Sequence, residues 1–360
     1  MKTLKRIFKY LGIFILTIVL VFAGFLGYMT MKDYRPKRVE SIEMLRAFEP
    51  DKFETQKLSR DTFTLYTWNI GYCGLGAEQD FFFDGGKMVR PTKELQQKYQ
   101  TGIIETIRSI DTVDFMMLQE VDRGSKRSYF QDQVKIIGET CSSDVYGYAT
   151  NYKSLFVPQP VPEPYGRCYG GIMTLSKIDY KPVASRFSLA PDAGWPTGLF
   201  MLKRCYLEFR YSMQNGKELV IINQHLSAYD DGTVKQQQMD TLKVKLLEEY
   251  KKGNYVVVGG DWNTYTPGYK SNLKNKGKDG VIEKSMEANY PEPGWKYIYD
   301  PSTATNRKLY EPYVAGQTDA VVIDYFLLSP NIDAISVKGI DLGFKNSDHH
   351  PVYLKIVLIK

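Results

Sequence analysis

Histidine is scarce in this sequence: there are three among 360 residues, and two of them stand together in the segment NSDHHP, residues 346–351. Histidine is the side chain whose ordinary pKa lies near neutrality, so a chain with few histidines can reserve them for proton transfer or metal binding. The segment also has the composition of a turn, because Asn, Ser, Asp and Pro all favour turns. Taken alone, it is most simply interpreted as a turn with a surface histidine pair.

Cysteine is also rare, and its spacing disfavours a structural zinc site. The four cysteines are Cys73, Cys141, Cys168 and Cys205, and none of them forms a C-x-x-C pair. Zinc sites typically combine cysteine and histidine at short ligand spacings, which this chain does not offer. Oxygen ligands are therefore the better candidates for holding a metal ion.

Excess charge is absent from most of the chain. The formal net charge is +6, but residues 1–40 contain eight basic and two acidic residues, and the other 320 residues carry 39 of each sign. Tight binding to nucleic acid without sequence preference depends on bulk positive charge. The neutral main part of the chain disfavours that class of protein.

The basic residues near the N-terminus enclose a long hydrophobic run. Between Lys9 and Lys32 lie 22 uncharged residues, YLGIFILTIVLVFAGFLGYMTM. A helix of this length, at about 1.5 Å per residue, crosses a hydrocarbon core of about 30 Å. A cleaved signal peptide has a shorter apolar region of about 7–15 residues and ends in a small-residue cleavage site, which is not evident here. We therefore predict an uncleaved transmembrane helix over residues 10–31.

Three further segments complete the predicted organisation. Residues 1–9 form a short basic tail that we expect to stay in the cytoplasm while the large domain is exported, although basic residues flank both ends of the span. Residues 32–60 are polar and weakly periodic, which predicts a stalk with one short helix. Residues 61–360 show no internal repeat and no second linker, and a chain with 43% hydrophobic and 14% aromatic residues can bury a large core. We predict one domain there.

Strand-like and helix-like patterns are mixed along this domain. Helical patterns occupy residues 92–110, 128–140 and 233–253, the last ending at a glycine. Several strand-like runs lack polar alternation, which indicates strands covered on both faces. The mixture predicts an α/β or α+β fold with a substantial sheet. The strand-like runs are residues 62–69, 114–120, 170–176, 204–211, 218–226, 255–262, 320–329 and 351–359.

Polar residues able to carry chemistry stand within these runs, at their C-terminal ends, or just before the last run. Such positions are where functional loops gather on a rigid scaffold. Each residue alone has a simple explanation as a turn or surface residue, but their joint placement, with histidines among them, favours one site. The residues are Asn69, Glu120, His225, Asp261, Asn263, Asp324, Asp348 and His349.

This set suits a magnesium-dependent reaction. Asn69, Glu120 and Asp348 offer oxygen atoms, which Mg²⁺ prefers, and Mn²⁺ accepts the same ligands. A histidine held by a carboxylate can activate water as a general base, and Asp324 is the carboxylate best placed to hold His349.

Seven segments resemble, in order, those of the endonuclease/exonuclease/phosphatase superfamily, which includes deoxyribonuclease-like nucleases and neutral sphingomyelinases. The match spans roughly residues 62–356. The resemblance implies a four-layered α/β/β/α sandwich of two packed mixed sheets, with the active site at one edge. The segments are LYTWNIG, MLQEVD, YGGIMTLS, INQHLSA, VVVGGDWNT, VVIDYFLLS and NSDHHPV.

The resemblance also implies roles for these residues. It implies metal ligands at Asn69 and Glu120, with Asp348 as a further ligand, and it leaves His350 outside the matched positions. The catalytic residues that it implies are His349 with its partner Asp324, Asp261 and Asn263 of the G-D-x-N signature, and His225 of the N-x-H-L motif.

The expected function is that of a membrane-anchored, Mg²⁺-dependent phosphoesterase that hydrolyses a phosphodiester or phosphomonoester with activated water. A tethered, neutral domain fits a lipid head group or a small phosphoester better than DNA. An exported deoxyribonuclease-like nuclease is the alternative, and a non-catalytic binding module on the same fold is an alternative of another class. Two aromatic segments, residues 80–84 (DFFFD) and 194–201 (GWPTGLFM), either face substrate or lipid or are packing residues.

Overall fold

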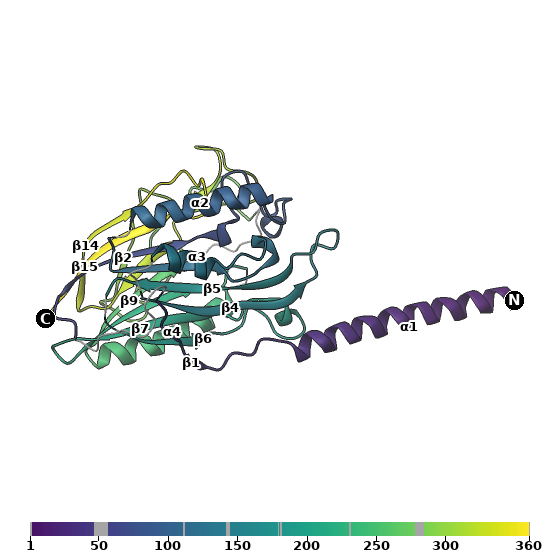
Figure 1. The fold of residues 1–360 in the computed structure, drawn as a ribbon, viewed down its shortest axis with the longest axis horizontal. Coiled ribbons are helices and arrows are strands. Elements are labelled where there is room, and N and C mark those ends of the chain that lie inside the picture. The colour runs from purple at the N-terminus through teal and green to yellow at the C-terminus, as the bar shows by residue number, and fades with distance from the viewer. Residues whose placement is uncertain are drawn as a thin grey trace.

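A seven-stranded sheet forms one half of the central sandwich (Figure 1). The computed structural model describes residues 2–46, 57–110, 112–141, 145–178, 180, 182–229, 232–277 and 284–359. Within this sheet β8 and β9 run parallel, joined by a helix, and the other neighbours are antiparallel. In spatial order its strands are β1 (Val39–Ser41), β6 (Val183–Ser188), β7 (Cys205–Ser212), β8 (Glu218–His225), β9 (Tyr255–Asp261), β13 (Asp324–Leu328) and β10 (Lys296–Ile298).

A six-stranded sheet forms the other half. Here β2 and β3 are the parallel pair, also joined by a helix. A separate two-stranded sheet pairs β11 (Asn306–Arg307) with β12 (Ala320–Val321). The six strands in spatial order are β14 (Ile332–Gly339), β15 (Val352–Leu358), β2 (Thr62–Asn69), β3 (Phe115–Asp122), β5 (Gly166–Ser176) and β4 (Val145–Val157).

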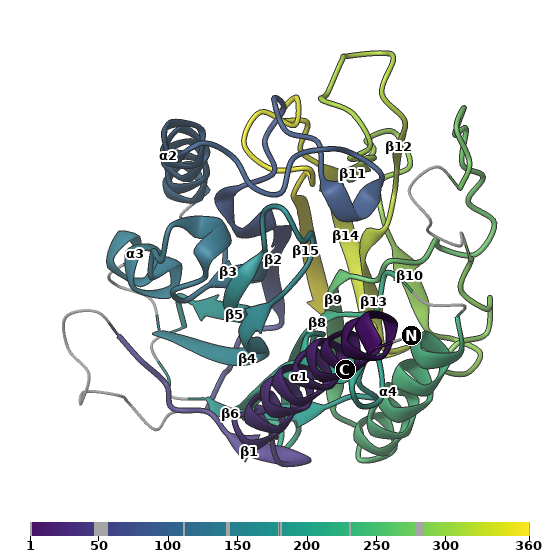
Figure 2. The same ribbon diagram turned by 90° about the vertical axis from the view of Figure 1, so that its right-hand side faces the viewer.

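Helices cover the outer faces of both sheets, which gives four layers (Figures 1 and 2). Helices α2 (Lys93–Ser109) and α3 (Gln133–Thr140) pack on the six-stranded sheet, and α4 (Thr233–Lys251) packs on the seven-stranded sheet. The largest apolar cluster lies between the sheets. The predicted α/β/β/α sandwich of two mixed sheets is therefore confirmed. Short 3₁₀ helices occupy Gly71–Cys73 (η1), Phe82–Asp84 (η2), Lys126–Ser128 (η3) and Thr197–Leu199 (η4).

The folded unit starts earlier in the chain than residue 61. Strand β1 pairs with β6 at the edge of the seven-stranded sheet, and Met44 and Leu58 are buried in the cluster between the sheets. The described residues of segment 32–60 contain this strand and no helix, and residues 47–56 lie outside the described part. The segment therefore contributes a sheet edge in addition to linking α1 to the domain.

Helix α1 (Lys2–Met31) projects from one end of the domain, so that the N-terminus and the C-terminus lie at opposite ends of the molecule (Figure 1). It is long and apolar enough to cross a membrane. Its last turns pack on the domain: Phe25 stacks on Phe200 with 6.2 Å between ring centroids, Met29 is buried, and Trp195 Nε1 donates to Thr30 Oγ1 at 3.2 Å.

A buried group of hydrogen bonds joins the two sheets within their largely apolar interface. Gln119 of β3 donates through Nε2 to Asn223 Oδ1 of β8 at 2.8 Å. Asn223 in turn donates through Nδ2 to the carbonyl oxygens of Leu118 and Met173, at 3.2 and 3.0 Å. Because both side chains are fully buried, these bonds fix how the two sheets are aligned.

We predict that Asn223→Ala lowers the free energy of unfolding by about 2 kcal/mol or more, because it removes the buried hydrogen bonds that Asn223 makes with the Gln119 amide and with the carbonyl oxygens of Leu118 and Met173. Urea unfolding of the purified chain in detergent measures the change. The exposed Asn289 provides a matched control, and Asn289→Ala should change the stability by less than about 0.5 kcal/mol. Equal stability of the two variants would show that the inter-sheet hydrogen bonds are not needed.

Candidate active site

The side chains of the candidate site continue the apolar face between the two sheets. In β8, Leu219 and Ile221 face the other sheet whereas Val220 faces α4. Because side chains alternate along a strand, His225 lies on the same inner face as Leu219 and Ile221. The same alternation places three further side chains on the inner face. In β2, Asn69 follows the inward-facing Phe63 and Leu65. In β9, Asp261 follows Tyr255 and Val257, and in β13, Asp324 precedes Phe326 and Leu328.

Strand pairing then brings three of these residues into one row. His225 is the partner of Asp261 in the parallel pair β8–β9, and Asp324 is the partner of Asp261 in the antiparallel pair β9–β13. Directly paired residues on neighbouring strands have adjacent side chains on the same face. The row ends at the edge of the sandwich, where the loops carrying His349 and Asn263 approach it.

Glu120 does not follow the alternation of its strand. Phe115 and Met117 of β3 face the other sheet, so Glu120 by alternation would face the helices. The pairing of β3 with β5 shifts register between Leu118 and Val121, and Glu120 has a left-handed backbone with φ of +54°. This bulge turns the carboxylate toward the site, at a cost of roughly 1–2 kcal/mol for a residue other than glycine. Strain of this kind is typical of functional positions.

The Asp261 carboxylate connects the two sheets at the site. Asn69 Nδ2, from the six-stranded sheet, donates to Asp261 Oδ2 at 3.1 Å, and the backbone nitrogen of Asn263 donates to Oδ1 at 2.9 Å. His225 Nε2 lies 3.5 Å from Oδ2. Burial, together with the charge of Asp324, raises the pKa of Asp261 to about 6. A carboxylate of this kind can hold or accept a proton close to neutral pH.

His349 is held by a buried carboxylate, as the sequence predicts. Its Nδ1 lies 2.8 Å from Asp324 Oδ2, and its Nε2 lies 2.9 Å from the side-chain nitrogen of Asn306 and 3.7 Å from both Asp261 Oδ2 and Asp348 Oδ2. Burial alone would lower the pKa of His349, but the surrounding carboxylates raise it to about 10. Because Nδ1 is bonded to Asp324, Nε2 is the ring atom that can exchange a proton with substrate or water.

His350 has a different environment from its neighbour. Its ring stacks on Phe344 with 3.7 Å between centroids, its Nε2 accepts from the Phe344 backbone nitrogen at 3.0 Å, and its Nδ1 bonds the Ala304 carbonyl at 2.9 Å. Burial lowers its pKa. His350 therefore fixes the loop before the last strand onto the fold, with both ring nitrogens occupied.

The Glu120 and Asp348 carboxylates fit a bound divalent cation. Both line the same cavity, and burial raises the pKa of Asp348 to about 6, with the negative charge of Glu120 contributing to the rise. Gly71 allows close approach here, since a Cβ at Gly71 would lie 2.8 Å from Asp348 Oδ1. A cation bound between these two carboxylates would offset their repulsion, and their oxygens are the donors that Mg²⁺ or Mn²⁺ prefers.

Asn69 lies beside this pair with its amide oriented by other bonds. Its Oδ1 accepts from the Gly71 backbone nitrogen at 3.0 Å, and its Nδ2 lies 3.3 Å from Glu120 Oε1. In this arrangement Asn69 orients Glu120, and its service as a metal ligand stays a prediction. A second group of potential ligands, Asp261, Asp324 and His349, has donor atoms within 4.8 Å of one another, and Asp324 Oδ2 and His349 Nδ1 are also hydrogen-bonded to each other.

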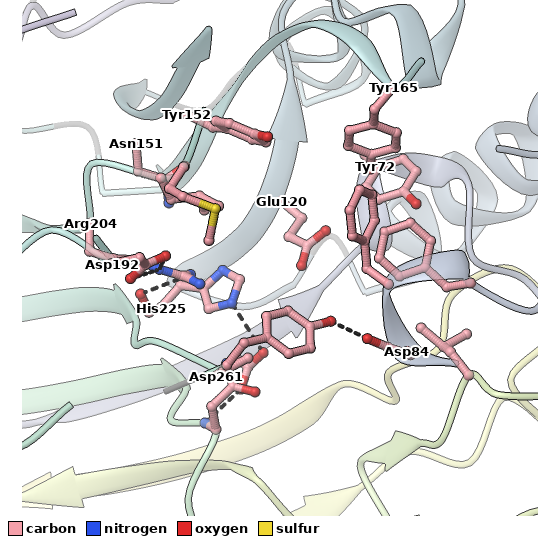
Figure 3. A pocket seen from close by; sticks show the side chains of 18 of the residues that line it. Tyr72, Asp84, Glu120, Asn151, Tyr152, Tyr165, Asp192, Arg204, His225 and Asp261 are labelled. Atoms are coloured by element: carbon pink, nitrogen blue, oxygen red, sulfur yellow. Dashed lines mark hydrogen bonds and ion pairs between the residues drawn. The ribbon is translucent and has the colours of Figure 1, made fainter. Parts of the chain in front are cut away.

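The floor of a cavity of about 930 Å³ is lined by Glu120, His225, Asp261, Asn263, Asp348 and His349. Figure 3 shows Glu120, His225 and Asp261 directed toward a common space, with the rings of Tyr72, Tyr152 and Tyr165 on another side of it. Phe81 and Phe83 pack against Tyr165 and also line the cavity, so residues 80–84 form part of its wall.

Two cavity residues were missed by sequence analysis. Arg204 lies beside His225 and is paired with Asp192 at 3.0 Å (Figure 3). Asn306 contacts His349. Burial, with the charge of Arg204 adding to it, lowers the pKa of His225, and the buried His225 Nδ1 has no hydrogen-bond partner. Neither Arg204, at the start of an apolar strand, nor Asn306, in a two-residue strand, carries a motif that could have revealed it.

Comparison with known proteins identifies the family. The pattern of the endonuclease/exonuclease/phosphatase family matches residues 66–349. The chain belongs to this family. No curated protein matches the sequence significantly.

Solved structures share the endonuclease/exonuclease/phosphatase fold at low sequence identity. An endonuclease/exonuclease/phosphatase from Beutenbergia cavernae is 16% identical with a TM-score of 0.55, covering 83% of this chain and 72% of its own. TDP2 from D. rerio, complexed with single strand DNA product, is 14% identical with a TM-score of 0.50 over 82% and 98% of the chains. ANGEL2, described as a 2′,3′-cyclic phosphatase, is 14% identical with a TM-score of 0.51 over 85% and 97%. At these identities the likeness is one of fold.

We predict that His349→Ala reduces turnover by about 10²- to 10⁴-fold, as expected for a residue that exchanges a proton or stabilises charge in the transition state. Asp324→Asn should also be severe, because it removes the charge that orients the imidazole. The double variant should be little worse than the more severe single variant, since the two groups act as a unit. Steady-state kinetics on a phosphodiester dye measures all three.

His350→Ala is the matched control for these variants. It removes contacts with Phe344 and Ala304, so we expect a lower melting temperature with turnover largely retained below that temperature. A folded His350→Ala protein as inactive as His349→Ala would contradict the assignment of His349 over His350.

Proposed function

We propose that this protein is a metal-dependent phosphoesterase that hydrolyses a phosphodiester or a phosphomonoester with activated water. One observation supports this most directly. Glu120 and Asp348, whose carboxylates suit a cation, line the same cavity as His349, which is hydrogen-bonded to Asp324. Structural roles alone do not account for so many buried ionisable groups, since burying charge without function is costly.

Each group has a proposed part in the reaction. Glu120 and Asp348 would hold Mg²⁺ or Mn²⁺, which when bound would polarise a phosphoryl oxygen. Asp261 orients the attacking water and accepts its proton, while the Asn263 backbone fixes that carboxylate at 2.9 Å. His349 would exchange a proton with the reacting phosphate through Nε2 or stabilise its charge. The Nδ1 atom of His225 is buried without a hydrogen-bond partner and, when protonated, can donate to a phosphoryl oxygen.

A lipid head group or a small phosphoester is the proposed substrate class. The domain beyond residue 40 is formally neutral, so it lacks the charge that attracts a nucleic acid backbone. The cavity combines its polar floor with apolar walls such as Phe81, Phe83 and Leu75. This combination suits a phosphate ester with an apolar part.

A nuclease is the second candidate, because the fold is shared with TDP2, whose structure holds a single strand DNA product. A binding module without chemistry is the alternative of another class. A panel of sphingomyelin, phosphoinositide, a phosphodiester dye and single- and double-stranded DNA, each with Mg²⁺, separates these functions. Turnover of DNA alone would favour the nuclease, and the absence of turnover on every substrate would favour the binding module.

We predict that activity requires Mg²⁺ or Mn²⁺ and that Glu120→Gln raises the metal concentration needed for half-maximal activity, because it replaces a charged ligand by a neutral one. Activity measured against metal concentration after EDTA treatment tests this. Glu139→Gln is the control, since Glu139 is exposed on α3 and should leave the metal dependence unchanged. Full activity in excess EDTA would contradict the metal requirement.

We also propose that α1 anchors the protein as a single-pass helix with the catalytic domain outside the cytoplasm. The chain should remain in the membrane fraction after alkaline extraction, and protease added to intact cells should digest the domain. A shortened soluble form that begins after Met31 would show a cleaved signal instead. Digestion only after the cells are opened would reverse the orientation.

A further inference from the structure

An apolar surface surrounds the point where α1 leaves the domain. Phe25 of α1 stacks on Phe200 and meets Phe156 edge to face, with 6.4 Å between the latter centroids. The α1 end of the domain also carries the hairpin between β4 and β5 (Figure 1). We call Phe156 and Val161 of this hairpin, together with Trp195 and Phe200 of the loop before β7, the membrane rim.

Three of the four apolar side chains in the membrane rim are exposed to solvent rather than packed in the core. Val161 is 82% exposed, Trp195 69% and Phe156 38%. Exposed apolar residues that gather around one point mark a binding surface more often than scattered ones do. Tryptophan in particular is enriched where a protein meets the boundary between lipid and water.

The position of α1 sets the depth of this rim relative to a bilayer. Lys32 is the first charged residue after the uncharged span, so it marks the level of the head groups. Phe25 precedes Lys32 by seven residues, which places it about 10 Å deeper at about 1.5 Å per residue. Thr30, which bonds Trp195, lies only about 3 Å below Lys32. If α1 crosses the membrane, Trp195 therefore lies at head-group level and Phe156 at the level of the upper acyl chains.

The catalytic cavity is continuous with this surface. Phe22, Phe25 and Leu26 of α1 line the same cavity as Asp261 and His349. The membrane helix is thus one wall of the active-site cavity. An opening bounded by a transmembrane helix and an apolar rim faces the lipid leaflet rather than the bulk water.

We infer that the membrane rim is seated in the leaflet on the domain's side of the membrane, and that the cavity admits its substrate laterally from that leaflet. The substrate class is a membrane phospholipid whose phosphate reaches the polar floor while its acyl chains stay against α1 and the rim. The substrate part of this inference rests on the proposed phosphoesterase function. The seating of the rim does not depend on it.

Fluorescence quenching tests the seating without any need for activity. The full chain is reconstituted in phosphatidylcholine vesicles that contain lipid brominated near the head group or near the chain end. The other tryptophans, Trp68, Trp262 and Trp295, are buried, so the emission lost in Trp195→Phe reports Trp195. We expect the shallow bromines to quench this component more strongly than the deep ones, and aqueous iodide to quench it little. Strong quenching by iodide with none by either lipid would overturn the seating.

Kinetics tests lateral entry. The variant Phe156→Ser/Trp195→Ser should lower the turnover of a fluorescent phospholipid in the same vesicles by about tenfold or more, relative to turnover of a water-soluble phosphodiester dye, because the rim no longer partitions into lipid. Ile335→Ser is the matched control: Ile335 is 53% exposed on β14, at the side of the domain away from α1, and its replacement should leave the ratio of the two rates unchanged (Figure 1). An unchanged ratio in the double variant would overturn lateral entry.

The two measurements separate failure of this inference from failure of the proposed function. Lipid quenching of Trp195 with no hydrolysis of either ester would support the seating and contradict the phosphoesterase. Hydrolysis of the soluble ester, abolished by His349→Ala, with iodide quenching of Trp195 would support the phosphoesterase and overturn the seating.

Discussion

The hydrogen bond between Asn69 and Asp261 is the interaction on which the site depends, because it joins the two sheets at the edge where the chemistry is placed. Asp261 is paired in register with His225 on one neighbouring strand and Asp324 on the other, so its position determines theirs. The buried bond between Gln119 and Asn223 holds the same edge from the interior. A shift of one sheet against the other would therefore separate Asn69 and Glu120 from His225, Asp261 and Asp324.

A buried site rich in carboxylates is stable only when its charges are compensated. His349 supplies one positive charge, held at 2.8 Å from Asp324. Glu120 adds a further negative charge, and it does so from a left-handed backbone position at a β-bulge. Both the backbone strain and the charge repulsion oppose folding, and a bound cation would relieve the second of them. The proposed metal requirement thus follows from the architecture of the site rather than from the identity of any single residue.

Helix α1 forms part of the cavity wall. In a freely soluble enzyme an apolar cavity wall faces water when substrate is absent, which is unfavourable. Here Phe22 and Phe25 complete the wall, and the aromatic contacts of Phe25 with Phe156 and Phe200 fix the helix relative to the domain. Under the proposed anchoring, α1 would determine which substrates can reach the cavity floor, in addition to keeping the domain at a membrane surface.

The sequence by itself determined an α/β fold with a substantial sheet, most central strands and the candidate residues, since apolar runs bounded by polar ends indicate strands covered on both faces. The sandwich of two sheets was implied by the resemblance to the superfamily. The sequence did not reveal β6, nor the strands β1, β4, β10 and β14, which are the outermost strands of the two sheets, where polar and glycine residues are tolerated. Alternation along the strands places Asn69, His225, Asp261 and Asp324 on one face, so that much of the site was already present in the pattern of residues. Only the tertiary structure decided that a bulge turns Glu120 to the same side, that Asn306 and Arg204 join the site, and that α1 borders the cavity. These features depend on pairing register and on contacts between segments far apart in the chain, which local sequence patterns do not encode.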